Sequence, residues 1–353
     1  MNLAVLAERA LSAVVEPFTW LASPGERVFV GSLAVAFVLG VGVWVLKLRG
    51  RISLTRFLLS PTVWLHRSAL LDYRFIVARS LVDALLFAPA VISSTAVAML
   101  TLAGLSRTIG RGPFEGQSAV LVVAALTVAT FLADDLVRYF AHRLLHRVPA
   151  LWDFHQVHHS AEVLTPFTVH RTHPVEGLIM RLSSSIGIGV AAGAVSWLFV
   201  KGASPLTVVG VHALSFAWAA LGANLRHSHV WISFGPVVER VLSSPAQHQV
   251  HHSKDPRHHD KNFASALALW DWMFGTLYVT GARERLTFGL DDEIVNHRQT
   301  VGSMLVGPFV AIARRTRAKA MTLLAFRRTE PARARALRAP TTERPPCTRP
   351  LVS

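Results

Sequence analysis

Residues 118–147, SAVLVVAALTVATFLADDLVRYFAHRLLHR, decide the fold class that this sequence predicts. The part from 118 to 133 carries no charged side chain, and its apolar pattern continues as a helix past Asp135. The segment then reaches His142 and His146, which are four residues apart and therefore lie on one face of a helix. It predicts a membrane helix that leads directly into a pair of candidate metal ligands.

The composition also favours a membrane protein. Hydrophobic residues make up 52% of the 353-residue chain, charged residues only 16%, and the mean hydropathy is +0.40. A soluble domain has about 25% charged residues, which argues against a water-soluble single-domain enzyme. Four further apolar ranges approach the length that a membrane helix needs: 28–46, 81–105, 182–200 and 204–225. We therefore predict an all-α integral membrane protein with about four to five transmembrane helices, the last two forming a hairpin.

Basic residues are unevenly distributed along the chain, whose formal net charge is +15. Residues 47–80 carry seven Lys and Arg against Asp72 alone, and residues 314–349 carry eleven against two acidic residues. Loops rich in Lys and Arg stay on the cytoplasmic side of a membrane, so both ranges, and residues 134–181, are predicted to face the cytoplasm. A basic balance in so apolar a chain does not indicate a nucleic-acid partner.

Histidine is concentrated in one part of the chain, with 15 of the 17 between positions 142 and 259. The sequence HQVHH occurs at 155–159 and again at 248–252, and its spacing puts three imidazoles on one helical face. Ten histidines are candidate metal ligands: His142, His146, His155, His158, His159, His173, His227, His248, His251 and His252. This number exceeds the four ligands of a structural zinc ion and fits two metal ions with open coordination positions.

The ligand pattern also excludes several kinds of metal site. The sequence has no HExxH zinc-protease motif and no Glu-x-x-His pair of the soluble carboxylate di-iron bundles. Cys347 is the only cysteine, so neither a thiolate metal site nor an internal disulfide can form. Imidazole alone does not distinguish iron, zinc, copper and nickel. We favour a pair of iron ions because the site is predicted to be embedded in the membrane and to face lipid. Attack on an unactivated C–H bond of a lipid needs an oxidising metal–oxygen species rather than a Lewis acid.

Three other polar residues are candidates for orienting the ligand rings through hydrogen bonds: Asp135, Glu176 and Asn262. Asn262 is also a candidate for direct metal ligation. An ordinary structural role stays open for each of them, which for Asp135 is an ion pair with Arg138. No catalytic residue is identified beyond the metal ligands.

The histidine boxes resemble those of the fatty acid hydroxylase superfamily, and of its sterol desaturase branch in particular. Residues 155–174, HQVHHSAEVLTPFTVHRTHP, are similar to the second box of that branch and its following His-Pro. Residues 246–278, AQHQVHHSKDPRHHDKNFASALALWDWMFGTLY, are similar to its last box and the Trp-Asp…Phe-Gly-Thr signature after it. Asn224 with His227 matches the element between these boxes, so the resemblance does not depend on one pattern.

The resemblance implies a transmembrane stem and a cytosolic helical cap that carries a His-ligated dimetal centre working with two iron ions. It implies O2 as oxidant and electrons from a redox partner protein in trans, because the sequence has no cytochrome b5-like His-Pro-Gly-Gly segment. The implied reaction is hydroxylation or desaturation of a lipid, either a sterol or a fatty acyl chain. The alternatives are an ether-lipid, carotenoid or lipid-headgroup hydroxylase of the same family, or a His-rich membrane metal transporter.

Three regions are predicted along the chain. Residues 1–117 form a lead-in and the first two transmembrane helices, 118–282 the catalytic domain, and 283–353 a basic, partly disordered tail. The Ala-, Arg- and Val-rich composition suggests a bacterial source, which predicts a bacterial inner membrane with the active site facing the cytoplasm.

Overall fold

A computed structural model describes residues 3–23, 28–87, 92–199, 214, 217–218, 222–291 and 299–337. Every regular element among these residues is a helix, which confirms the predicted all-α class. The longer helices are α1 (Leu3–Thr19), α2 (Val30–Val43), α5 (Arg67–Val82), α6 (Ser94–Thr108), α7 (Ala119–Arg147), α8 (Pro149–His159), α9 (Pro174–Phe199) and α14 (Val301–Leu337). The shorter ones are η1 (Trp20–Ala22), η2 (Trp44–Leu48), α3 (Leu54–Leu58), α4 (Pro61–Trp64), η3 (Asp83–Phe87), η5 (Pro166–His170), η6 (Ala223–Leu225), α11 (Gly235–Val238), α12 (Pro245–His251), η7 (Pro256–His258) and α13 (Leu269–Met273).

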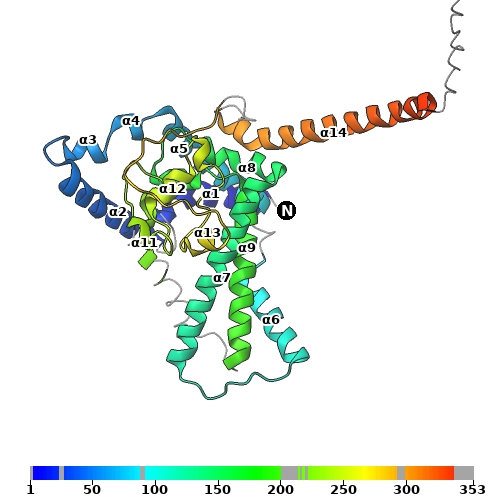
Figure 1. The fold of residues 1–353 in the computed structure, drawn as a ribbon. Coiled ribbons are helices and arrows are strands. Elements are labelled where there is room, and N and C mark those ends of the chain that lie inside the picture. The colour runs from blue at the N-terminus through cyan, green and yellow to red at the C-terminus, as the bar shows by residue number, and fades with distance from the viewer. Residues whose placement is uncertain are drawn as a thin grey trace, which may run out of the picture. The chain divides into compact units, whose positions relative to one another are not determined.

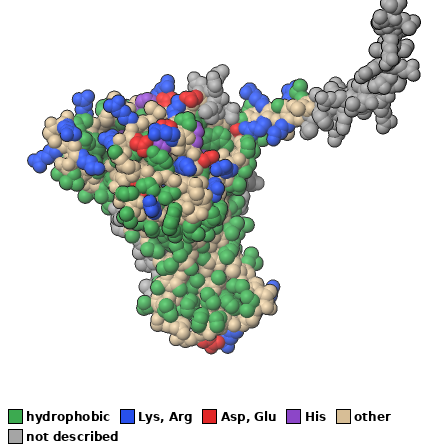
Figure 2. Space-filling view, in the orientation of Figure 1, with side chains coloured by type: hydrophobic (Ala, Val, Ile, Leu, Met, Phe, Trp, Pro, Cys, Tyr) green, Lys and Arg blue, Asp and Glu red, His purple; other side chains and the backbone are tan. Residues whose placement is uncertain are grey.

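Helices α6, α7 and α9 lie side by side and form a stem, while the other elements of the first 308 residues gather at the end of the stem where α7 ends and α9 begins (Figure 1). We call this second part the cap. Figure 2 shows a stem surface that is mostly hydrophobic, with Lys and Arg side chains over the cap. Exposed apolar side chains such as Leu132, Ile186 and Val190 cover the stem. A surface of this kind suits the hydrocarbon interior of a bilayer.

Three helical stretches among the described residues are long and apolar enough to cross a membrane: Val30–Leu48, Ala119–Arg147 and Pro174–Phe199. They correspond to the predicted spans at 28–46, 118–133 and 182–200. The predicted single span over 81–105 is wrong, because η3 ends at Phe87 and the non-helical Ser93 precedes α6. The predicted span at 204–225 lies largely outside the described residues.

Glycines let the stem helices approach each other closely. A Cβ atom added at Gly187 of α9 would lie 2.7 Å from a methyl carbon of Val137 in α7. One added at Gly193 would lie 2.5 Å from the carbonyl oxygen of Ala98 in α6. Inside lipid there is no hydrophobic driving force between helices. Small residues at such positions allow close van der Waals packing, which holds the helices together instead.

Replacement of Gly193 by alanine is therefore expected to lower the stability of the stem by about 1–3 kcal/mol, because the added methyl group overpacks the α6–α9 contact. The midpoint of thermal unfolding in detergent micelles measures this effect. Gly104→Ala is the matched control, since a Cβ atom at Gly104 in α6 would meet nothing within 4 Å. Equal midpoints for the two variants would contradict the packing described here.

Residues that favour helix N-termini stand at the beginning of the two cap helices that carry the HQVHH boxes. Pro149 begins α8 directly after α7, at the first helical position that proline favours. Ser244 begins α12 with a capping box, in which its hydroxyl accepts from the Gln247 amide and the Gln247 side chain accepts from the Ser244 amide. Each box is thereby fixed on a short, well-defined helix.

The chain divides into two compact units, Met1–Pro308 and Phe309–Ser353. The second unit begins within α14, which continues to Leu337. The tail that was predicted to be partly disordered is thus helical from 309 to 337, and the residues after 337 lie outside the described part of the chain.

Candidate metal centre

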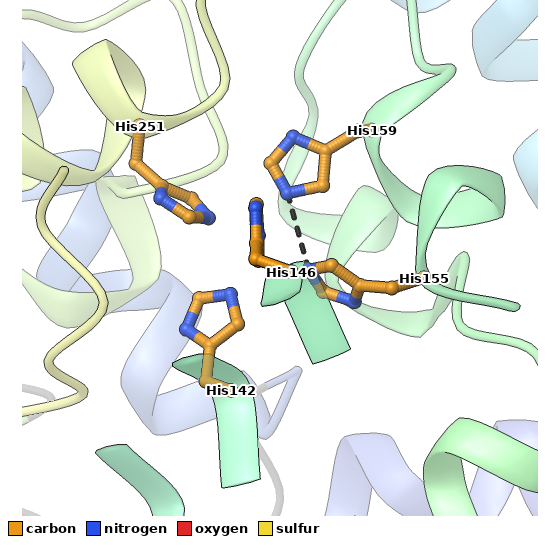
Figure 3. A group of neighbouring side chains, drawn as sticks. All are labelled: His142, His146, His155, His159 and His251. Carbon is orange, nitrogen blue, oxygen red and sulfur yellow. Dashed lines mark hydrogen bonds between the residues drawn. The ribbon is translucent and has the colours of Figure 1, made fainter. Parts of the chain in front are cut away.

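Nine of the ten candidate ligands come together in two adjacent groups. The five-histidine group comprises His142, His146, His155, His159 and His251, and the four-histidine group comprises His158, His227, His248 and His252. In each group, one nitrogen from every ring lies within 4.8 Å of those from all the others. Figure 3 shows the five rings of the first group pointing toward one another from α7, α8 and α12.

The spacing of the HQVHH box explains how one helix serves both groups. The prediction that this spacing puts all three imidazoles on one face is wrong at this centre, because His158 directly precedes His159 and successive residues of a helix point about 100° apart. His155 and His159 of α8 therefore point into the five-histidine group, while His158 joins the other group. Helix α12 and the residue that follows it mirror this division, since His248 and His252 point into the four-histidine group and His251 into the five-histidine group.

Hydrogen bonds hold several rings by the nitrogen that faces away from the group. The Nδ1 atoms of His142 and His251 lie 2.8 Å from the carbonyl oxygens of Phe263 and Lys261, respectively. The Nδ1 atom of His155 lies 2.9 Å from Oε1 of Glu176. These acceptors fix the proton on Nδ1 and leave Nε2 with a free electron pair for a metal.

His248 differs from these three because its outer nitrogen faces a cation. The guanidinium of Arg226 donates to Nδ1 of His248 over 3.0 Å and to the carbonyl oxygen of Ala264 over 2.9 Å. Arg226 is only 2% exposed. The sequence analysis missed this contact, although Arg226 precedes the candidate ligand His227 directly.

Burial keeps the imidazoles neutral. It lowers the pKa of His155 from 6.5 to about 3 and that of His158 to about 4. The pKa values of His159, His248 and His252 are also well below the ordinary value, with burial as the main cause. Metal binding requires neutral imidazole, so burial keeps these rings free of the second proton that would prevent ligation.

The nitrogen atoms themselves fit a bound cation. In the four-histidine group, Nε2 of His227 lies 3.2 Å from Nε2 of His158 and 3.0 Å from that of His248. In the five-histidine group, Nε2 of His146 and of His251 are buried and have no hydrogen-bond partner among the described residues. Buried polar atoms without a partner are rare, and a metal ion at each group would satisfy them.

His173, the tenth candidate ligand, lies in neither group. Its Nε2 is 3.0 Å from the carbonyl oxygen of Leu305, and its Nδ1 accepts from the amide of Val175 over 3.1 Å. The ring also packs against Phe154 at a centroid distance of 4.7 Å. His173 therefore anchors the start of α9 rather than facing the candidate metal ions.

Of the three residues predicted to orient ligand rings, only Glu176 contacts one. Asp135 instead accepts from the amides of Ala266 and Leu267 at 2.8 Å and from the Trp270 indole at 2.9 Å. It thereby ties α7 to the loop that follows the last histidine box.

Asn262 likewise bonds to backbone groups. It donates to the carbonyl oxygen of Gln247 over 3.1 Å and accepts from the Tyr278 amide over 2.7 Å. Its φ of 57° is in the left-handed region, where asparagine is tolerated better than most residues. The side chain thus shapes the loop beside α12, and neither of its contacts is to a candidate ligand.

Two cavities adjoin the two groups. The first, of about 530 Å³, reaches His142, His155, His158, His227 and His248 and continues to charged side chains of α5, α7 and α9. The second, of about 490 Å³, reaches His146, His159, His251 and His252 and is bordered by Trp152 and Lys254. Both volumes are in the range of small-molecule binding sites.

Known proteins resemble the part of the chain that carries this centre. A family described as fatty acid hydroxylase matches residues 127–276. The alkylglycerol monooxygenase of Danio rerio is 31% identical over 164 residues, which are 46% of this chain and 32% of that protein. The ornithine lipid hydroxylase OlsE of Rhizobium tropici is 29% identical over 187 residues, 52% of this chain and 49% of that protein.

A very-long-chain aldehyde decarbonylase of Oryza sativa is 30% identical over 174 residues, 47% of this chain and 25% of that protein. This chain thus spans between a quarter and half of the length of these relatives. No solved structure matches it. All nine clustered histidines fall within residues 127–276, the part of the chain that matches the fatty acid hydroxylase family.

Proposed function

We propose that this protein is a membrane-bound non-haem di-iron oxygenase, which hydroxylates or desaturates a lipid with O2 and electrons from a separate redox partner protein. The observation that carries the proposal is the pair of adjacent, buried, all-imidazole groups next to a cavity. The names of the relatives, a monooxygenase and a lipid hydroxylase among them, support an oxygenase acting on a lipid.

The nine clustered histidines would hold two iron ions, and the bound ions would supply the activation of O2. Glu176 and the Phe263 carbonyl would keep the rings of His155 and His142 in their ligating orientation. Seven of the nine rings are buried, which limits the access of water to the centre and protects an oxidising site from side reactions. The first cavity would place a C–H bond of the substrate beside both groups.

The overall reaction balances in either form. In hydroxylation, one oxygen atom of O2 enters a C–H bond, and two electrons and two protons convert the other to water. In desaturation, two hydrogen atoms leave neighbouring carbons, and O2 with two electrons and two protons yields two water molecules. Both forms need an external electron donor, for which the redox partner is proposed.

The charge distribution supports a cytoplasmic active site. Lys and Arg side chains cover the cap, the end of the molecule that also carries the histidine groups (Figure 2). The positive-inside rule then favours a cap in the cytoplasm, and a bacterial inner membrane is proposed with it.

The metal-transporter alternative finds no support in the part of the stem that lies away from the histidine groups. A transport path would need ionisable groups along the membrane helices. The described residues 94–108, 119–133 and 182–199 contain no His, Asp or Glu.

The proposal is tested by supplying 18O2 to cells that express the protein and analysing their lipids by mass spectrometry. Hydroxylation adds one 18O atom to a lipid, whereas desaturation removes two mass units without incorporating 18O. Metal analysis of the purified protein is expected to give about two iron ions per chain. Cells that show neither product, together with purified protein that lacks iron, would refute the proposed function.

A further inference from the structure

The first cavity is unusually polar for the binding site of a lipid. Four arginines line it, Arg79, Arg138, Arg181 and Arg226, against three carboxylates, Glu16, Asp83 and Glu176. The candidate metal ligands are neutral imidazoles, so they cancel none of the charge of a bound metal ion. The cavity therefore carries an excess of positive charge that favours an anionic ligand.

Most of these charged side chains already have partners. Asp83 accepts from both terminal nitrogens of Arg181 at 3.2 Å and lies 3.3 Å from Nε of Arg79. Arg138 differs, because its hydrogen-bond partner among the described residues is the hydroxyl of Ser184, at 2.9 Å, and no carboxylate pairs with it there. Arg138 is half-buried and lines the cavity, so it offers hydrogen-bond donors that no carboxylate neutralises.

Arg138 lies close to the candidate metal ligand His142. It lies four residues before His142 in α7, which is about 6 Å along the helix axis. Both side chains line the first cavity. Arg138 is on the side of His142 that faces the apolar stem, since α7 runs from the stem into the cap (Figure 1). A group held by Arg138 thus lies between the stem surface and the histidines.

A lipid with its chain along the apolar stem would meet this charged end of the cavity first. We propose, on the basis of the function proposed above, that the cavity binds the anionic headgroup of a lipid, with Arg138 as the main contact. The carbon that is oxidised then lies within about 6 Å of the headgroup, not in the middle of the acyl chain. The ligand chemistry is a phosphate or carboxylate on a single- or double-chain lipid.

Binding can be tested separately from turnover by native mass spectrometry of the purified, iron-loaded protein in detergent. Lysophosphatidic acid and a monoacylglycerol with the same acyl chain differ only in the phosphate. The protein is expected to bind lysophosphatidic acid at least about tenfold more tightly, since one charge-assisted contact is worth that much. Arg138→Gln should bring the two affinities within about twofold, and Arg138→Lys should keep most of the preference.

Arg111→Gln is the matched control, because Arg111 is an exposed arginine that pairs with Glu115 outside the cavity. This variant should keep the full preference for lysophosphatidic acid. Equal binding of the two lipids by the unmodified protein, or a preference that survives in Arg138→Gln, would overturn the inference. Inorganic phosphate that binds as tightly as lysophosphatidic acid would also overturn it, because the site would then hold a free ion and not a lipid.

The position of oxidation separates this inference from the proposed function. Tandem mass spectrometry of the 18O-labelled product is expected to find the label in the headgroup or in the carbons next to it. A label in the middle of the chain would refute the headgroup site but leave the oxygenase intact. The absence of any oxidised lipid would refute the oxygenase, while the binding experiment would still decide the headgroup site.

Discussion

Replacement of His158 by alanine is expected to lower the bound metal from about two ions to about one per chain and to reduce lipid oxidation at least about 100-fold. The reason is the division of the ligands. His158 belongs to the four-histidine group, and its loss leaves three imidazoles there while the five-histidine group keeps all its ligands. Metal analysis of the purified variant and 18O incorporation into cellular lipids measure the two effects.

Two other histidine variants make this expectation specific. His259→Ala should leave metal content and turnover unchanged, because His259 is exposed and belongs to neither group. His173→Ala should retain both ions, since His173 belongs to neither group and its ring nitrogens bond to the backbone of Leu305 and Val175. Loss of one ion from the His173 variant, or two ions retained by His158→Ala, would show that the centre is built differently.

The spacing of the histidines made most of this centre predictable. Residues three or four apart in a helix share a face, so the sequence indicated that His142 and His146 can reach one metal ion and that the three imidazoles of each HQVHH box lie together. Spacing does not tell which group a residue joins. His158 and His159 are neighbours in the sequence and lie in different groups, because successive residues of a helix point in directions about 100° apart.

Long-range contacts account for what the sequence did not predict. The pattern His-Pro made His173 a candidate ligand, but its partner is a backbone carbonyl of residue 305, far along the chain. Asp135 was a candidate for orienting a ligand ring, but it accepts hydrogen bonds from the amides of Ala266 and Leu267, which are also far along the chain. Arg226 directly precedes the candidate ligand His227, but its position in the sequence does not indicate the contact with His248. Tertiary hydrogen bonds of this kind are set by the folded chain and not by local periodicity.

The stem shows a similar limit. Apolar length identified the helices around 118–147 and 182–200 correctly, because crossing a membrane requires an uninterrupted run of apolar residues. The same criterion joined residues 81–105 into one helix although Pro89 lies within them. Apolar composition does not reveal such an interruption, whereas Ile92 and Ser93 between η3 and α6 are not helical.

Breaking the buried ion pair between Arg171 and Asp72 is expected to lower the stability of the protein strongly. Both side chains are fully buried, and Nη1 of Arg171 lies 2.7 Å from Oδ1 of Asp72. Arg171→Met is expected to lower the free energy of unfolding by about 3–5 kcal/mol, because it leaves the carboxylate buried without its counter-ion. Burial already raises the pKa of Asp72, against the opposing effect of Arg171. Denaturant unfolding in detergent, followed by circular dichroism, measures the loss.

Arg67→Met is the matched control for this variant. Arg67 forms an ion pair of the same chemistry with Glu162 at 2.8 Å, but its side chain is 83% exposed. A surface pair contributes about 0–1 kcal/mol, so this substitution should change the unfolding free energy little. If the two arginine variants were equally stable, burial would not govern the contribution of Arg171.

The ion pair also matters for the metal centre. Arg171 donates to the carbonyl oxygen of Val157 over 2.9 Å and to the hydroxyl of Ser160 over 2.9 Å, and these two residues flank His158 and His159. Removal of Arg171 should therefore lower metal occupancy as well as stability. The double variant Arg171→Met/Asp72→Asn removes the uncompensated charge of Asp72. It does not restore the hydrogen bonds of Arg171 to Val157 and Ser160. It is expected to recover part of the stability and little of the metal, which distinguishes the electrostatic role of Arg171 from its role in holding the second histidine box.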